Sequence, residues 1–418
     1  MRMKEKIMTA IKSDSSVMIG GTLLSQLIPF ALAPILRRLY TPEDFGTLSI
    51  YFSIASIVSF ASTLNYHSAI TLPRRDENSK SLLLGTLITS IIFNAVLFII
   101  IVIGNPYGWF SRFELGNFIY ILPVSIFFSA SHLTFTNWFA RKKEYLGLSI
   151  NKVVRRIAEG GAQTGLFYSI KNTGLVIGNF VGDVFNFVYY IFQFRKHSKD
   201  FKFDLRRINR VLGRYRNFPI KGMAPNLLNI SANYIPIFLI NDFFTKSTAG
   251  QLDLSRQVLA FPLALISVSI SKILLQGYSE LKIQRKSVRA FTFQYFKPLL
   301  ILSIIGFSTV YFFGEELFTF VFGDQWNQAG TFSEMMIFYF ILMFLISPFS
   351  SLFIALEELT INSAWQVFRF ISILSLGFFE YPDLTSFILR LTIVETINYS
   401  IYGFLIYLVS RKYERSLQ

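Results

Sequence analysis

The feature that most constrains this chain is a series of apolar runs about twenty residues long, of which Val17 to Leu36 is the first. A helix of that length spans roughly 30 Å, the thickness of a bilayer's hydrocarbon core. The run ends at Arg37 and Arg38 and is followed by the polar turn YTPEDFG. It has no small-residue cleavage site at its end and is too long for a signal peptide, so we expect it to remain as the first span.

A segment similar to this one recurs in the second half of the chain. With Leu23 aligned on Leu227, the same offset places Thr41 on Thr245 and Gly46 on Gly250. The offset also preserves a long apolar helix, a short polar turn and a glycine near the start of the next helix. The pattern predicts two related halves.

Composition supports a polytopic membrane protein. Of the 418 residues, 52% are hydrophobic and only 16% are charged, whereas about 25% are charged in soluble domains. The chain has no Cys, which excludes disulfides, a thiolate nucleophile and Cys-ligated metal. The net charge of +15 could suggest nucleic acid. However, the basic residues gather in short loops between spans, which is typical of membrane topology, so no nucleic-acid partner is expected.

The apolar pattern predicts about twelve transmembrane helices in an all-α fold, over 16–38, 46–70, 80–104, 117–139, 148–170, 173–194, 222–244, 251–275, 296–313, 334–356, 361–379 and 384–409. If the N-terminus is inside, the inner segments hold 28 of the 40 Lys and Arg residues and the outer loops hold 5. The outer five are Arg37, Arg38, Arg112, Lys171 and Lys246. This asymmetry predicts that both termini are cytoplasmic.

The longest inner loop, 195–221, separates six spans from six. It divides the chain into an N-terminal six-helix bundle (1–194), a basic cytoplasmic linker (195–221) and a C-terminal six-helix bundle (222–418). An even number of crossings in each half predicts a parallel repeat. Within the linker, apolar residues recur at helical spacing beside several arginines, which predicts an amphipathic helix on the anionic inner leaflet. A plain tether with solvated charges is the alternative.

Seven basic residues lie inside the predicted spans: Lys152, Arg155, Arg156, Arg256, Lys272, Arg369 and Arg390. Each would cost about 2.5–3.5 kcal/mol against lipid at mid-bilayer. Lys152 and Lys272 lie near inner ends, from which their side chains can reach the membrane surface. We expect arginines among the others to line a hydrophilic cavity. The competing interpretation is structural pairing, for example of Arg155 with Glu159 or Asp183.

The fifth span carries the clearest polar stripe. Lys152, Arg155, Arg156, Glu159 and Gln163 share one helical face at i, i+3, i+4, i+7 and i+11. Asn179, Gly182, Asp183 and Asn186 form a candidate facing stripe in the sixth span. Glu395 stands in the twelfth span and Arg369 in the eleventh. A cavity with more cations than carboxylates suits an anionic passenger, because guanidinium groups bind phosphate through two parallel hydrogen bonds.

The sequence contains no enzyme motif that we could find. The phosphate-binding GxxxxGK[ST] loop, HExxH and GxSxG are all missing. His67, His132 and His197 are scattered and do not suggest a metal site. We therefore expect no catalytic activity, no cofactor and no bound metal.

Several segments resemble the Wzx-type O-antigen and polysaccharide-unit flippases of the multidrug/oligosaccharidyl-lipid/polysaccharide (MOP) exporter superfamily. The resemblance covers nearly the whole chain and rests on RRLYTPEDFGTLSIY (37–51), LPRRDE (72–77), RKKEY (141–145), YRNFPIKGMAPNLLN (215–229), AGQLDLSRQVLAFPLALIS (249–267) and LFTFVFGDQWNQAG (317–330). These segments are typical of the family and are not catalytic signatures.

The resemblance implies twelve helices in two six-helix bundles around a cationic cavity. It implies a substrate: an undecaprenyl-pyrophosphate-linked oligosaccharide, as an O-antigen or capsule repeat unit, moved from the cytoplasmic to the periplasmic leaflet of the bacterial inner membrane. Membrane lipids, a polysaccharide polymerase and a chain-length regulator are the other expected partners. The predicted substrate-binding residues are Arg37, Arg155, Arg156, Arg256 and Arg369, and the predicted coupling or polar cavity residues are Glu159, Asp183 and Glu395.

Two other functions compete with the flippase. A small-molecule antiporter of the same fold is the first, although an arginine-rich cavity would repel cationic drugs. An integral-membrane polysaccharide polymerase or ligase is the second, although such enzymes tend to need a large outer loop. Here the two longest outer loops run only about 104–116 and 314–333.

Overall fold

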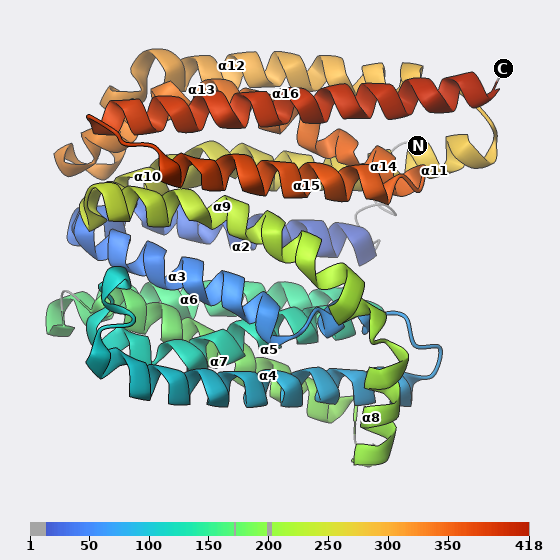
Figure 1. The fold of residues 1–418 in the computed structure, drawn as a ribbon, viewed down its shortest axis with the longest axis horizontal. Helices are drawn as coiled ribbons and strands as arrows, with labels where there is room; N and C mark the ends of the chain where they lie inside the picture. Colours follow the sequence, from blue (N-terminus) through green and yellow to red (C-terminus); the bar gives the residue numbers. More distant parts are fainter. Residues whose placement is uncertain (1–13, 171–172, 199–202, 418) are drawn as a thin grey trace, which may run out of the picture. The chain divides into compact units, whose positions relative to one another are not determined.

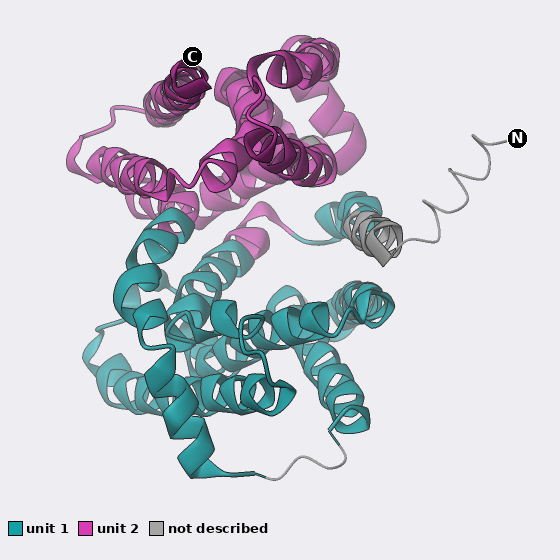
Figure 2. Ribbon diagram, turned by 90° about the vertical axis from the view of Figure 1, so that its right-hand side faces the viewer, with its two compact units in different colours: residues 1–40, 47–230 teal, residues 41–46, 231–418 magenta. Residues whose placement is uncertain are grey.

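A computed structural model describes residues 14–170, 173–198 and 203–417, with side chains from residue 27 onward apart from 262, 264 and 268. The basic residues of the N-terminus and Lys171, which entered the prediction of orientation, lie outside the described residues. The described chain is helical throughout and divides into two compact units. Unit 1 comprises residues 1–40 and 47–230, and unit 2 comprises 41–46 and 231–418 (Figure 2).

Unit 1 consists of long helices that run along one common direction, with α8 lying across them (Figure 1). Its main helices are α2 (Asp14–Leu39), α3 (Pro42–Ser62, of which 42–46 belong to unit 2), α4 (Asp76–Gly104), α5 (Leu122–Arg141), α6 (Tyr145–Ile170), α7 (Gly174–Lys196) and α8 (Leu205–Arg214). Helix α6 packs against α2 and α7, and α5 packs against α4 and α7. Short 3₁₀ turns join several of these helices, including η1 (Tyr66–Ala69) between α3 and α4.

Unit 2 is also built from long helices. They are α9 (Met223–Phe243, entering from unit 1), α10 (Lys246–Pro262), α11 (Val268–Ile283), α12 (Arg289–Phe322), α13 (Asn327–Ile346), α14 (Ser351–Ala355), α15 (Leu359–Leu374) and α16 (Leu384–Leu417). Helix α13 packs against α10, α12 and α16, and α15 packs against α16. A π-helical segment, η6 (Leu263–Ser267), connects α10 to α11.

The helices follow the apolar pattern of the sequence. Each predicted span lies on a long helix or on a pair of consecutive helices, such as α10 and α11 for 251–275. By length and composition alone, eight helical segments of the described chain could cross a membrane. Helix α6 is not one of these eight segments because it carries four charged residues, Lys152, Arg155, Arg156 and Glu159. Helix α15 is not one of them because it has only 16 residues. The predicted all-α membrane fold is confirmed.

The two repeated polar turns begin helices in the same way. Thr41 precedes α3, and its hydroxyl lies 3.3 Å from the Asp44 N–H, while the Asp44 carboxylate accepts from Thr41 N–H at 3.0 Å. Thr245 precedes α10 and forms the equivalent reciprocal pair with Thr248. Such capping boxes satisfy N–H groups that a helix start leaves without partners. The sequence repeat is therefore also a repeat of local structure.

Candidate functional site

The charged residues of α6 meet the polar stripe of α7 in unit 1. Glycines permit the approach, because a Cβ at Gly178 would lie 2.8 Å from the Gln163 backbone nitrogen and one at Gly182 would lie 2.8 Å from the Glu159 Cβ. Small residues of this kind let membrane helices pack closely. The contact places Asp183 opposite Arg155.

Two ion pairs result. The Arg155 Nη2 lies 2.7 Å from the Asp183 Oδ1, and the Arg156 Nη1 lies 2.9 Å from the Glu159 Oε2. The second oxygen of Glu159 accepts from the Asn179 amide at 2.9 Å. The alternatives left by the sequence are thereby resolved, since Arg155 pairs with Asp183 and Glu159 pairs with Arg156. This centre is balanced, with two guanidinium groups facing two carboxylates.

A neutral polar network continues from this centre. The Asn151 amide donates to the Asn186 Oδ1 at 2.7 Å, and the Asn186 amide lies 3.1 Å from the His132 Nδ1. The Tyr190 hydroxyl lies 3.2 Å from the same nitrogen and 3.0 Å from the Thr136 hydroxyl. The sequence had not indicated Asn151 and Tyr190 as members of this network. Tyr190 lies four residues after Asn186, a spacing that could have identified it.

Unit 2 contains a second, more deeply buried centre between α15 and α16. Both carboxylate oxygens of Glu395 accept hydrogen bonds from the Arg369 guanidinium. Nη2 donates to Oε1 at 2.6 Å, and Nε donates to Oε2 at 3.0 Å. Its remaining nitrogen, Nη1, donates to the Asn233 Oδ1 of α9 at 3.1 Å. The side chains of Arg369 and Glu395 are 4% and 3% exposed. Every guanidinium nitrogen of Arg369 is thus occupied within the unit.

Aromatic rings surround this ion pair. The guanidinium carbon lies 5.6 Å from the centre of the Tyr399 ring and 6.0 Å from that of Trp365. Trp365 stacks on Tyr402 at 3.7 Å and donates its indole N–H to the Asn398 carbonyl. The sequence analysis missed these rings, although Trp365 and Tyr399 each stand four residues from a member of the ion pair. They favour a cation in the protein interior.

The other two predicted arginines lie on α2 and α10. Arg37 lies in the last turn of α2 and is 1% exposed. Arg256 is half-buried on α10 and interacts electrostatically with Tyr339 and Tyr399. None of the described carboxylates forms an ion pair with Arg256 within 4.0 Å. Arg256 therefore carries a charge that its own unit does not neutralise.

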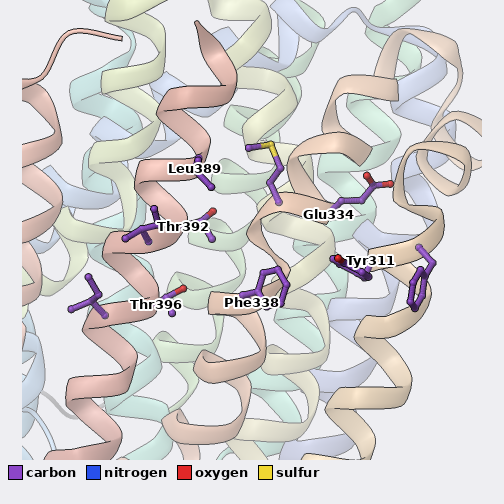
Figure 3. A pocket seen from close by; sticks show the side chains of 10 residues that line it. Tyr311, Glu334, Phe338, Leu389, Thr392 and Thr396 are labelled. Atoms are coloured by element: carbon purple, nitrogen blue, oxygen red, sulfur yellow. The ribbon is translucent and has the colours of Figure 1, made fainter. Parts of the chain in front are cut away.

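A separate groove of about 760 Å³ lies on unit 2, between α12, α13 and α16. Figure 3 shows Thr392 and Thr396 of α16 on one side of Phe338 of α13, and Glu334 of α13 and Tyr311 of α12 on the other side. The remaining lining residues are apolar: Phe312, Met335, Leu389, Ile393 and Ile397. None of the predicted site residues lines this groove. Its walls resemble the lipid-facing surface of a membrane protein more than a site for charged groups.

The helical fold of the described residues therefore carries eight segments that could cross a membrane, together with ion pairs buried between its helices. The chain matches the family model described as "Polysaccharide biosynthesis protein" over residues 35–331, and it belongs to that family. A comparison with curated protein sequences gives no match.

Solved structures with a similar fold belong to transporters. An inward-facing multidrug resistance MATE family transporter of the MOP superfamily has a TM-score of 0.73 at 12% identity, with 93% of this chain and 96% of that chain covered. An outward-facing structure of such a transporter has a TM-score of 0.66 at 11% identity, with 97% and 96% covered. The likeness establishes the twelve-helix MOP fold. The chain thus belongs to a polysaccharide biosynthesis family and has the fold of these transporters.

Proposed function

We propose that this protein moves a polyprenyl-pyrophosphate-linked oligosaccharide, an O-antigen or capsule repeat unit, from the cytoplasmic to the periplasmic leaflet of a bacterial inner membrane. Both termini would then lie in the cytoplasm. Three lines support the proposal: the polysaccharide family, the transporter fold and an arginine-rich interior. A substrate bearing two phosphates and many sugars fits a transporter that belongs to a polysaccharide family.

The observation that carries the proposal is the charge balance of the buried arginines. Arg155, Arg156 and Arg369 each lie within 3 Å of a carboxylate oxygen. Arg256 forms no ion pair with a described carboxylate. A pyrophosphate can supply the missing counter-charge through two parallel hydrogen bonds to the guanidinium. Arg256 is thus the leading candidate to bind the substrate's phosphates.

The paired carboxylates offer a way to couple transport to protons. If Arg155 moves onto a phosphate, Asp183 is left without its cation in a medium of low dielectric. Such a carboxylate favours the protonated form. Glu159 and Glu395 stand in the same relation to Arg156 and Arg369. We propose these three carboxylates as coupling groups whose protonation accompanies substrate binding.

A small-molecule antiporter is the second candidate, because the solved structures with the same fold are multidrug transporters. The positive charge of Arg256, which forms no ion pair with a described carboxylate, disfavours cationic drugs as passengers. The family match to polysaccharide biosynthesis also favours the lipid-linked substrate.

The test uses cells that lack this protein. Lipid-linked oligosaccharide is quantified on each leaflet, and surface polysaccharide is measured beside it. We expect accumulation on the inner leaflet and loss of surface polymer, both rescued by the wild-type chain. Arg256→Ala should fail to rescue, and Arg256→Lys should rescue weakly because an ammonium cannot form the bidentate contact. Arg411→Ala, which changes an exposed arginine of α16, is the matched control and should rescue fully.

Each alternative predicts a different result. If single repeat units reach the outer leaflet but remain unpolymerised, the protein is a polymerase or ligase and the flippase proposal is wrong. If leaflet distribution is normal and the cells become sensitive to small toxic cations, the protein is a drug antiporter. Immunoblots of membrane fractions establish that each variant is present at the wild-type level.

A further inference from the structure

Helix α8 has one buried face and one open face. It begins at Asp204, whose carboxylate accepts from the N–H groups of Arg206 at 2.9 Å and Arg207 at 3.3 Å. Ile208 and Val211 are 2% and 5% exposed. The opposite side of the helix is exposed. Ile208 and Val211 are therefore already covered by protein, and the exposed side of the helix is what remains for another surface.

The position of α8 is fixed by α4. A Cβ at Gly85 would lie 3.1 Å from side-chain carbons of Ile208 and Leu212, so α8 approaches α4 closely at this glycine. The Arg207 Nη1 pairs with the Glu77 Oε2 at 2.7 Å. These contacts span the first three turns of α4. In Figure 1, α8 lies across α4 and extends past it. A helix that crosses a membrane-spanning helix near its end runs along the membrane surface.

The exposed face of α8 is a basic stripe. Arg206, Arg210 and Arg214 stand at i, i+4 and i+8, all exposed, so their guanidinium groups follow one line along the helix. Two large apolar side chains lie at its N-terminal end, Phe203 at 59% and Leu205 at 57% exposed. Cations beside exposed apolar side chains are the combination with which interfacial helices bind anionic lipid.

We propose that this stripe binds the headgroups of anionic phospholipids. Arg206, Arg210 and Arg214 contact lipid phosphates, and Phe203 and Leu205 enter the boundary with the acyl chains. An acidic protein would also suit the three arginines. The observations favour lipid, because the stripe lies level with the first turns of a membrane-spanning helix and because the adjacent apolar side chains need a hydrocarbon surface.

The chain has no Cys, so a single introduced Cys is the only site that a thiol-reactive label modifies. Asn209 is exposed and adjoins Arg210, so Asn209→Cys carries an environment-sensitive fluorophore at the stripe. The full-length protein is reconstituted into nanodiscs of pure phosphatidylcholine or of phosphatidylcholine with phosphatidylglycerol. Quenching by headgroup-labelled lipid is then measured. We expect stronger quenching with phosphatidylglycerol, and we expect salt to reduce it by screening. Asn117→Cys, an exposed position in η4 (Gly116–Tyr120) with no Lys or Arg within four residues along the chain, is the control label and should show no preference for phosphatidylglycerol.

Charge variants complete the test. Each arginine near an anionic surface contributes roughly a fivefold preference for it. The triple change Arg206→Glu, Arg210→Glu and Arg214→Glu should therefore abolish the effect of phosphatidylglycerol. The matching triple change to Lys should retain it, since the attraction depends on charge. The Arg207–Glu77 pair is left intact in both, and thermal unfolding confirms that the fold survives. A label that responds equally in the two nanodiscs overturns the proposal. If the reversed triple variant then also fails in cells, the stripe serves an acidic protein instead.

Discussion

Within unit 2, Gly46 packs against the N-terminus of α10, and Gly250 packs against the N-terminus of α3. A Cβ on Gly46 would collide with the Lys246 carbonyl, and one on Gly250 would collide with the Pro42 carbonyl and lie 2.9 Å from the Gly46 nitrogen. The two residues are the equivalent glycines of the sequence repeat. Because each is near the N-terminus of its helix, α3 or α10, the contact is reciprocal. The repeat is thus preserved where the two repeated segments meet.

The first prediction concerns this contact. Gly46→Ala and Gly250→Ala each force a Cβ into backbone atoms, which cannot move as a flexible side chain can. We expect each to destabilise the protein by about 2–3 kcal/mol or more, as overpacking does. Thermal unfolding in detergent measures the effect. Gly306→Ala in α12, where a Cβ would meet nothing within 4 Å, should be neutral or slightly stabilising. Tolerance of alanine at both positions would contradict the packing described.

The second prediction concerns the ion pair of unit 2. Glu395→Gln leaves the buried Arg369 charge without its counter-ion, so we expect a loss of about 3–5 kcal/mol. Replacing both residues, as Arg369→Met with Glu395→Met, should cost less than the single change because no unpaired charge remains. Denaturant unfolding of the double variant and of the single variants Arg369→Met and Glu395→Met completes a double-mutant cycle that measures the coupling. A coupling free energy near zero would show that the two groups are independent.

The third prediction separates structural from transport roles of Arg155. Asp183→Asn should lower stability, because Arg155 loses its partner. The exchanged variant, Arg155→Asp with Asp183→Arg, should recover part of that stability, since the opposite charges still face each other. Transport should stay lost if Arg155 also binds the substrate's phosphates. Recovery of both stability and transport would assign Arg155 a purely structural role.

The fourth prediction concerns pH. His67 in η1 is buried between α3 and α4, and burial lowers its pKa from 6.5 to about 4. The folded state therefore prefers neutral His67, whereas the unfolded chain takes a proton below pH 6.5. The contribution of His67 to the free energy of unfolding is complete above pH 6.5. It falls by about 3 kcal/mol at most as the pH decreases towards 4. His67→Gln should remove that part of the pH dependence. Unfolding midpoints at pH 7 and pH 4.5 measure it, and an unchanged difference would contradict the assignment.

Much of the fold follows from the sequence because lipid imposes a simple rule. Apolar runs of fixed length become helices, and polar stripes within them must turn towards one another. The stripes of α6 and α7 illustrate this, since spacing alone indicated that Asp183 faces the arginines. The amphipathic helix within the basic linker was predicted for the same reason, from periodicity.

Other features depended on contacts that spacing cannot specify. Arg369 binds Glu395 and Asn233 from two other helices, and no local pattern indicates which helices will be neighbours. The sequence likewise did not show that Ile208 and Leu212 of α8 would lie against Gly85 of α4, because these residues are more than 120 positions apart in the chain. Helix packing decides whether an arginine forms an internal ion pair or is available to bind a substrate.

The order of the ion pairs along the chain has a consequence for how the protein is made. Arg369 is synthesised 26 residues before Glu395, and Arg155 precedes Asp183 in the same way. A helix such as α15, entering the bilayer alone, would expose an uncompensated cation at a cost of about 2.5–3.5 kcal/mol. Insertion together with α16 removes that cost. Insertion of α15 and α16 together, as a hairpin, is therefore favoured by that amount over insertion one by one, and the same holds for α6 and α7.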